Sequence, residues 1–150
     1  PLNLTLTLPP PSYARKGGEV VAAMLAKVGI NAKIENVEWA QWLSGPFKGN
    51  FDMTIINHVE PLDYVKYANP DYYWGYNSSA FNALVKKRAE AARGRAQVTL
   101  YADIQRQIAN DAVNAIIFNP SQVSVSRKGL KGLWANSPVA ANDLSQVSWQ

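Results

Sequence analysis

A chain of 150 residues, 47% hydrophobic and 17% charged, has the composition of a single globular domain. The net charge of +4 comes from dispersed lysines and arginines that lie apart from the aromatic residues, so no nucleic-acid-binding surface is predicted. The sequence contains no cysteine, which excludes disulfides, thiolate metal sites and thiol nucleophiles. No apolar run reaches the ~20 residues of a transmembrane helix. Because the chain starts at Pro1 within a strand-like pattern, we expect a processed or excised piece of a longer protein.

The first part of the chain predicts a strand followed by a long helix. Leucines alternate with polar residues over 2–8, which is typical of a strand with one buried face. Ser12 is a plausible N-cap for a helix that reaches Val28, where Gly29 supplies a left-handed end. Gly17-Gly18 weakens the first turns, so the helix could begin later. Its core-facing stripe is predicted to consist of Val21, Met24, Leu25 and Val28.

Two more strands are predicted before the middle of the chain. The first covers residues 32–37, and a short helix over 39–43 then ends at Gly45-Pro46. The second covers 51–56, and its nearly continuous apolar character predicts burial on both faces.

The second half predicts two helices and then two strands. Ser78 or Ser79 can cap the first helix, and the second, over 97–113, has the clearest helical periodicity in the chain. A buried strand is expected over 115–118 and a half-exposed strand over 122–126.

This order of elements predicts an α/β fold with a mixed, mostly parallel sheet flanked by helices. We expect residues 1–126 to form this unit and residues 127–150, whose periodicity fades, to form a separate tail. In such sheets ligands bind outside the carboxyl ends of the strands. Those ends are predicted at 9–13, at 37–39 and from Asn57 onward.

The connection over residues 57–78 is the strongest candidate for a binding surface. It is unusually long for a compact domain, and its six aromatic residues predict an ordered segment. Acids at a strand's carboxyl edge suit a ligand ammonium or guanidinium group, and an aromatic ring can line a pocket. Most rings of the Tyr72–Tyr76 cluster are expected to pack internally. The predicted ligand-binding residues are Trp39, Asn57, His58, Glu60, Asp63, Tyr64 and Trp74.

Catalytic and metal chemistry were considered for the same segment. His58 is the only candidate base, no serine lies in a GxSxG elbow, and no phosphate-binding loop occurs, so neither an enzyme nor a cofactor is predicted. His58 is expected to line a cleft or to form structural hydrogen bonds. His58, Glu60 and Asp63 are close enough in sequence to bind zinc or nickel together. Such mixed loops are common on protein surfaces, and the sequence alone favours no metal site.

Several segments, in their order and spacing, resemble the second lobe of family 5 extracellular solute-binding proteins, the peptide-, nickel- and opine-binding components of ABC importers. They are the LTLTLP strand, EVVAAMLAKVGINAKIENVEWAQWL, the G-x-F-D pattern at Gly49 to Asp52, the YADIQRQIANDA helix, AIIFNP and GLKGLW. The resemblance runs through almost the whole chain.

The resemblance implies a non-catalytic, exported protein with two lobes that close over a solute. It implies a periplasmic location, a peptide- or opine-like ligand, and the membrane subunits of an importer as partners. Residues 127–150 would return to the other lobe, and the isolated chain could self-associate. The family often has Gly-Trp and then Asp-Tyr after the G-x-F-D strand, whereas this chain has Asn57-His58 and a later Asp63-Tyr64. Either Asp63 or Glu60 would then meet a ligand amine.

The main alternative is a free-standing protein-interaction module that uses the aromatic connection 57–78. A monomer that binds a protein partner through this connection, and no small solute, would favour that alternative.

Overall fold

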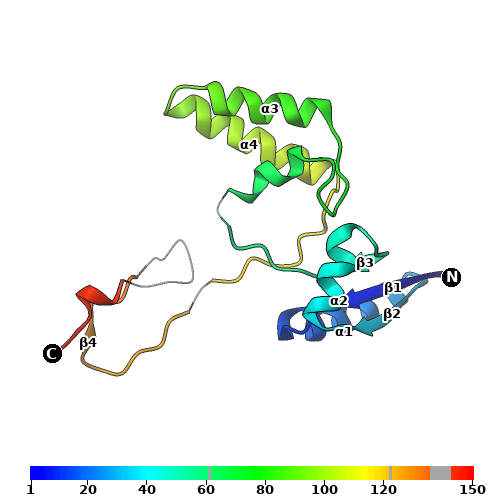
Figure 1. Cartoon of the computed structure of the whole chain (residues 1–150), viewed down its shortest axis with the longest axis horizontal. Coiled ribbons are helices and arrows are strands. Elements are labelled where there is room, and N and C mark those ends of the chain that lie inside the picture. Colours follow the sequence, from blue (N-terminus) through cyan, green and yellow to red (C-terminus); the bar gives the residue numbers. More distant parts are fainter. Residues whose placement is uncertain (61, 122, 136–142) are drawn as a thin grey trace.

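The computed structural model of the chain describes residues 1–60, 62–121, 123–135 and 143–150. Figure 1 shows three parts that follow one another along the chain. We call residues 1–56 the sheet unit and residues 63–114 the helix unit. The described residues after 127 form a small ribbon that stands apart from the helix unit in Figure 1. Within the described residues, no helix combines the length and apolar character needed to cross a membrane.

The sheet unit is built on three parallel strands. They are β1 (Leu2–Leu8), β2 (Ile30–Asn36) and β3 (Met53–Thr54), in the order β2-β1-β3. The β1–β2 register runs from Leu2 opposite Ile30 to Leu8 opposite Asn36, and Leu6 lies opposite Met53 on the other side. The prediction of an α/β fold with a largely parallel sheet is confirmed. Because all three strands run the same way, their carboxyl ends share one edge.

Helix α1 (Ser12–Ala26) packs on the sheet through a narrow stripe. Ala14 and Gly18 are buried and Val21 and Leu25 are half-buried, a spacing that follows the helical repeat. The predicted core positions Met24 and Val28 are instead 62% and 73% exposed. The prediction was wrong for Met24 and Val28 because the helical pattern allows two overlapping stripes. The helix packs through the stripe that contains the small residues Ala14 and Gly18.

The glycine pair does not delay the start of α1. The helix begins at Ser12, its N-cap is Pro11, and no side chain caps it, so the predicted Ser12 cap is not formed. Packing explains the glycine at position 18, because a Cβ there would lie 2.3 Å from Leu8 Cδ1. At Gly17, by contrast, nothing lies within 4 Å of an added Cβ. Leu8 is fully buried, so Gly18 allows the helix to approach the sheet closely.

The strand predicted over 51–56 is shorter and less buried than expected. In the chain, α2 (Trp39–Ser44) and the 3₁₀ turn η1 (Pro46–Lys48) come before this strand, and the long connection comes after it. Only Met53 and Thr54 pair with β1, and of the predicted strand only Ile55 is buried. The Asp52 carboxylate takes the place of a backbone partner, because it accepts the Thr5 N–H at 2.8 Å.

In the helix unit, α3 (Ser79–Glu90) and α4 (Arg95–Asn110) pack side by side, and the 3₁₀ segment η2 (Asp63–Ala68) contacts α3. Ser78 is the N-cap of α3 and accepts the Phe81 N–H at 3.2 Å, as predicted. The helix predicted over 97–113 runs from Arg95 to Asn110. The core of this unit is formed by Phe81, Ile104 and Ile108.

The two strands predicted after α4 are not formed by the described residues. Residues 115–118 pair with no other strand, and Ile116 is 76% exposed. Val123 and Val125 are 83% and 92% exposed, and residue 122 lies outside the described residues. A strand needs a backbone partner, and these segments lie on no edge of the sheet. Periodicity alone could not supply that information.

The C-terminal ribbon pairs β4 (Leu130–Lys131) with β5 (Ser148–Trp149) in antiparallel fashion, next to the 3₁₀ turn η3 (Leu144–Gln146). The division of the chain at residues 126 and 127 stays a prediction.

Candidate ligand-binding site

The carboxyl ends of the three strands meet at one edge, as predicted. After β3, the Asn57 N–H donates to the Tyr13 hydroxyl at 3.2 Å, which links the end of β3 to the start of α1. Arg15 donates to the Val37 carbonyl at 3.3 Å and to the Glu38 carboxylate at 3.2 Å, which links α1 to the end of β2. The connection 57–78 therefore leaves the sheet at the edge where α/β proteins bind ligands.

The imidazole of His58 lies between an acid and a phenol. Its Nδ1 is 2.7 Å from Asp63 Oδ2, and its Nε2 is 2.7 Å from the Tyr73 hydroxyl. An ionised carboxylate only accepts, so Nδ1 carries the proton in neutral His58 and Nε2 accepts from Tyr73. Burial raises the pKa of the Tyr73 phenol well above its usual value, which keeps that hydroxyl protonated. These bonds fix both the tautomer and the ring orientation.

Glu60 lies close to His58 and Asp63, and the three side chains form one cluster. One ligand atom from each of these residues lies within 4.8 Å of the other two. The pKa of Glu60 is lowered, first by its own backbone N–H and then by the N–H of Val59, which donates to its carboxylate at 3.2 Å. Glu60 is exposed, whereas the side chains of His58 and Asp63 are 29% and 16% exposed.

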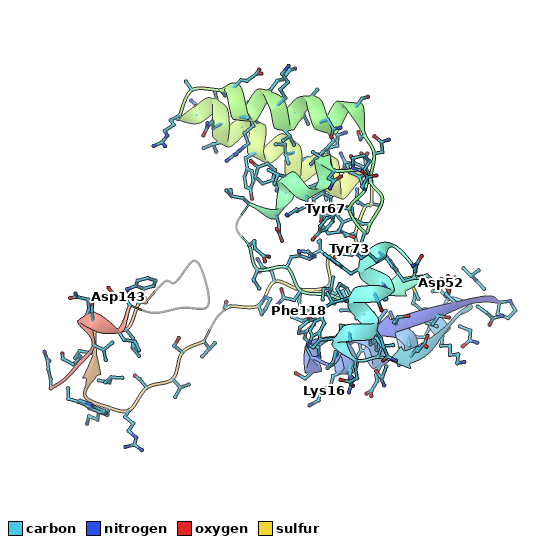
Figure 2. The ribbon with its side chains drawn as sticks, viewed as in Figure 1. Lys16, Asp52, Tyr67, Tyr73, Phe118 and Asp143 are labelled. Atoms are coloured by element: carbon cyan, nitrogen blue, oxygen red, sulfur yellow. The ribbon has the colours of Figure 1, made fainter. Side chains whose placement is uncertain are left out.

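A pocket of about 450 Å³ opens beside this cluster, between the connection and α4. Four predicted residues line it together: His58, Glu60, Asp63 and Tyr64. The opposite wall includes residues that the sequence analysis did not select, namely Tyr67, Tyr101, Gln105 and Asn114. Figure 2 shows Tyr67 and Tyr73 in the region where the helix unit meets the sheet unit.

Hydrogen bonds hold the tyrosines of the pocket in place. The Tyr67 hydroxyl accepts from the Asn114 amide at 2.7 Å, and burial raises the pKa of the Tyr67 phenol. The Tyr64 hydroxyl accepts from Arg88, and its ring meets Tyr101 edge-on at 5.4 Å. The pocket thus combines carboxylates, which suit a cationic group on an organic solute, with aromatic walls. The guanidinium of Arg88 already lies over the rings of Tyr64 and Tyr101, at 5.0 and 5.1 Å.

Three predicted site residues do not line this pocket. The ring of Trp74 stacks on that of Tyr67, with 4.3 Å between their centroids. Asn57 belongs to the sheet edge. Trp39 lies on α2, 41% exposed and edge-on to Trp42. Their roles in ligand binding stay predictions.

Most of the Tyr72–Tyr76 cluster packs internally, as predicted. Tyr73 contacts Phe47 at 5.5 Å and Trp42 at 5.9 Å between ring centroids. Tyr76 packs edge-on against Phe81 and donates its hydroxyl to Asp111 at 2.5 Å. None of these rings lines the pocket.

The pocket residues that the sequence missed could not be found from local pattern. Tyr67 and Asn114 are 47 residues apart, and their hydrogen bond depends on how α4 packs. Tyr101 belongs to the same helical stripe of α4 as the buried Ile104 and Ile108. A tyrosine in such a stripe was the one available signal, because its hydroxyl needs a polar neighbour.

Comparisons with known proteins found similarity in structure. A scan of protein-family models and a search of curated proteins gave no match. A putative peptide-binding protein AppA from Clostridium difficile superposes with a TM-score of 0.80 at 21% identity, over 99% of this chain and 33% of that one. A dipeptide-binding protein from Pseudoalteromonas sp. SM9913, solved with Met-Leu, superposes with a TM-score of 0.68 at 15% identity, over 99% of this chain and 32% of that one.

A third neighbour is the ABC transporter-associated periplasmic binding protein DppA from Helicobacter pylori, solved with the peptide STSA. It gives a TM-score of 0.62 at 24% identity, over 75% of this chain and 24% of that one. The chain therefore spans about a quarter to a third of the length of these proteins. It has the fold of one lobe of a periplasmic binding protein, which confirms the resemblance stated from the sequence at the level of fold. These neighbours are described as binding proteins.

Proposed function

We propose that this chain is one lobe of a periplasmic solute-binding protein that captures a small peptide- or opine-like solute for an ABC importer. The observation that carries the proposal is the pocket lined by His58, Glu60, Asp63 and tyrosines, next to the carboxyl edge of a parallel sheet. The fold shared with peptide-binding proteins supports the class of ligand. Residues 1–126 form the ligand-binding lobe, and residues 127–150 return to the other lobe.

In this proposal the carboxylates of Glu60 and Asp63 bind a cationic group of the solute. Tyr64, Tyr67 and Tyr101 exclude water from it, which strengthens the charge interaction. The second lobe closes over the pocket and adds the remaining contacts, so the isolated chain binds weakly. The membrane subunits of the importer then receive the solute. The aromatic connection is less suited to docking a protein partner, because Tyr72, Tyr73 and Trp74 pack on one another.

The proposal is tested by calorimetric titration of the full-length gene product, freed of metal with EDTA, against Met-Leu and a small set of di- to tetrapeptides. Glu60→Ala and Asp63→Ala are each expected to weaken binding about tenfold or more, because each removes a charged hydrogen-bond acceptor. Asp71→Ala, in the same connection but outside the pocket, serves as the matched control. Unchanged affinity in both variants, with folding intact, would remove these acids from the site.

A further inference from the structure

The acids beside His58 lack the cations that normally neutralise such a cluster. Among the described residues, no lysine or arginine forms an ion pair with Glu60 or Asp63, and His58 is the single basic partner of Asp63. Two carboxylates held close together repel each other unless a positive charge lies between them. The cluster therefore favours a bound cation.

The identity of the donor atoms narrows the kind of cation. One imidazole nitrogen and two carboxylate oxygens form a ligand set suited to first-row transition metals. In a tetrahedral site with bonds of ~2.1 Å, donor atoms lie about 3.4 Å apart. The three donor atoms already lie within 4.8 Å of one another, so small side-chain rotations bring them to that spacing.

We propose that His58, Glu60 and Asp63 bind a divalent transition-metal ion, for which Zn²⁺ is the probe. The sequence alone did not favour this site, since only the fold shows that the three side chains converge. Three protein ligands leave a fourth position, which faces the pocket and is open to water or to a donor atom of another molecule. The ion would use the same two carboxylates as the cationic group of the proposed solute, so the two ligands compete for one site, and the ion is tested alone.

The Tyr73 hydroxyl can stay hydrogen-bonded to His58 Nε2 when the imidazole changes from one tautomer to the other. In the metal-free protein, Nδ1–H donates to Asp63 and Nε2 accepts from the Tyr73 hydroxyl. In the metal-bound protein, Nδ1 binds the ion, and Nε2–H donates to the same hydroxyl oxygen. A hydroxyl can both donate and accept, so Tyr73 supports either tautomer. Metal-binding histidines are typically held by such a partner on the second nitrogen.

The test is a calorimetric titration of the untagged, metal-free full chain with ZnCl₂ in a non-chelating buffer, with no peptide present. The expected result is one ion per chain. Glu60→Gln decides the outcome, because this exposed side chain can change without loss of packing. It is expected to weaken binding by more than the roughly 10- to 100-fold typical of a supporting residue, and Tyr73→Phe by about tenfold. Asp71→Asn, in the same connection, is the matched control and is expected to leave the affinity unchanged.

A spectroscopic readout separates a metal site from a merely structural hydrogen-bond chain. His58 is the only histidine in the chain, so long-range ¹H–¹⁵N spectra report this ring without ambiguity. Zinc is expected to shift the Nδ1 resonance and to leave the proton on Nε2. Circular dichroism confirms that each variant is folded. Absence of stoichiometric binding, equal affinity in Glu60→Gln and Asp71→Asn, or zinc on Nε2 would each overturn the proposal. Failure here leaves the peptide titrations of the proposed function unaffected.

Discussion

In the sheet unit the backbone of β1 is paired along all seven residues with β2, whereas in the helix unit α3 and α4 are joined through side chains. The helix unit has buried rings and aliphatic residues at its centre and polar contacts around them, such as Gln107 to Ser78 and Asn114 to Tyr67. This difference in how the units are held together predicts which substitutions destabilise each of them most. Loss of a large side chain should damage the helix unit most, while added volume should damage the close helix–sheet approach.

The aromatic connection belongs to both units. Tyr73 packs on Phe47 and Phe51 of the sheet unit, and Trp74 stacks on Tyr67 of the helix unit. A change in this cluster is therefore a test of whether the two units unfold together.

The largest expected effect is that of Phe81→Ala in the helix unit. Phe81 is fully buried, and its loss leaves a cavity between Tyr67 and Tyr76, so the free energy of unfolding should fall by about 3–5 kcal/mol. Urea denaturation followed by circular dichroism measures the change. Phe118→Ala, at a side chain that is 55% exposed, is the matched control and should cost less than about 1 kcal/mol. A second, unshifted transition would show that the sheet unit unfolds separately, and equal losses in both variants would contradict the assignment of the core.

Gly18→Ala tests the sheet unit by adding one methyl group. Its Cβ would lie 2.3 Å from Leu8 Cδ1, so α1 or Leu8 must shift, at a cost of about 1–3 kcal/mol. Gly17→Ala adds the same group in open space and should stabilise the helix by about 0.5–1 kcal/mol. Thermal and urea unfolding compare the two variants. If both were stabilising, the close contact between α1 and β1 would be ruled out.

Alkaline pH tests the cluster that joins the units. Burial raises the pKa of Tyr73 in the folded protein, so its stabilising contribution is complete below the unfolded value of ~10 and is lost as the pH rises above it. Each such tyrosine lowers the free energy of unfolding by about 1.4 kcal/mol per pH unit in that range. Tyr73→Phe should therefore flatten the decline between about pH 10 and pH 11.5, as measured by urea denaturation. Parallel profiles for the two proteins would show that Tyr73 is not buried.

The smallest expected effect is that of Ser78→Ala at the start of α3. The hydroxyl accepts the Phe81 N–H and receives a bond from Gln107, so its loss should cost about 1 kcal/mol. Ser79→Ala, at the next position and exposed, should change stability by less than about 0.5 kcal/mol. Urea denaturation of both variants measures the difference. Equal costs would mean that the cap is not specific to Ser78.

The sequence predicted the elements whose signal is local. The strand over 2–8 and the serine cap of α3 each depend on a few neighbouring residues, and both form, with Ser78 as the cap. The single buried face expected of the strand was wrong, because Thr7 is buried and Leu2 is 56% exposed. The strand expected over 115–118 depended on a partner that no local pattern can show. The stripe of α1 was assigned to Met24 and Val28 because hydrophobicity was weighed above size, whereas Gly18 marks the face that packs.

The candidate site was predictable in part for the same reason. His58, Glu60, Asp63 and Tyr64 follow a strand end within a few residues, and they line one pocket, as expected from the topology of parallel sheets. Trp39 was chosen from a different strand end and does not line this pocket; it lies edge-on to Trp42, and its role stays a prediction. Tyr67, Tyr101 and Asn114 come together only through the packing of the helix unit, which single-sequence patterns do not describe.

Asp52 has an influence that reaches beyond its own hydrogen bond. Its carboxylate accepts the Thr5 N–H one position before Leu6 pairs with Met53. This bond therefore helps to fix the register of β3, which has only two residues. A slip by one residue would exchange the two faces of β3 and would break the bond from the Thr54 hydroxyl to the Thr7 carbonyl. Because the connection that carries His58 begins shortly after Thr54, this register also determines where that connection leaves the sheet.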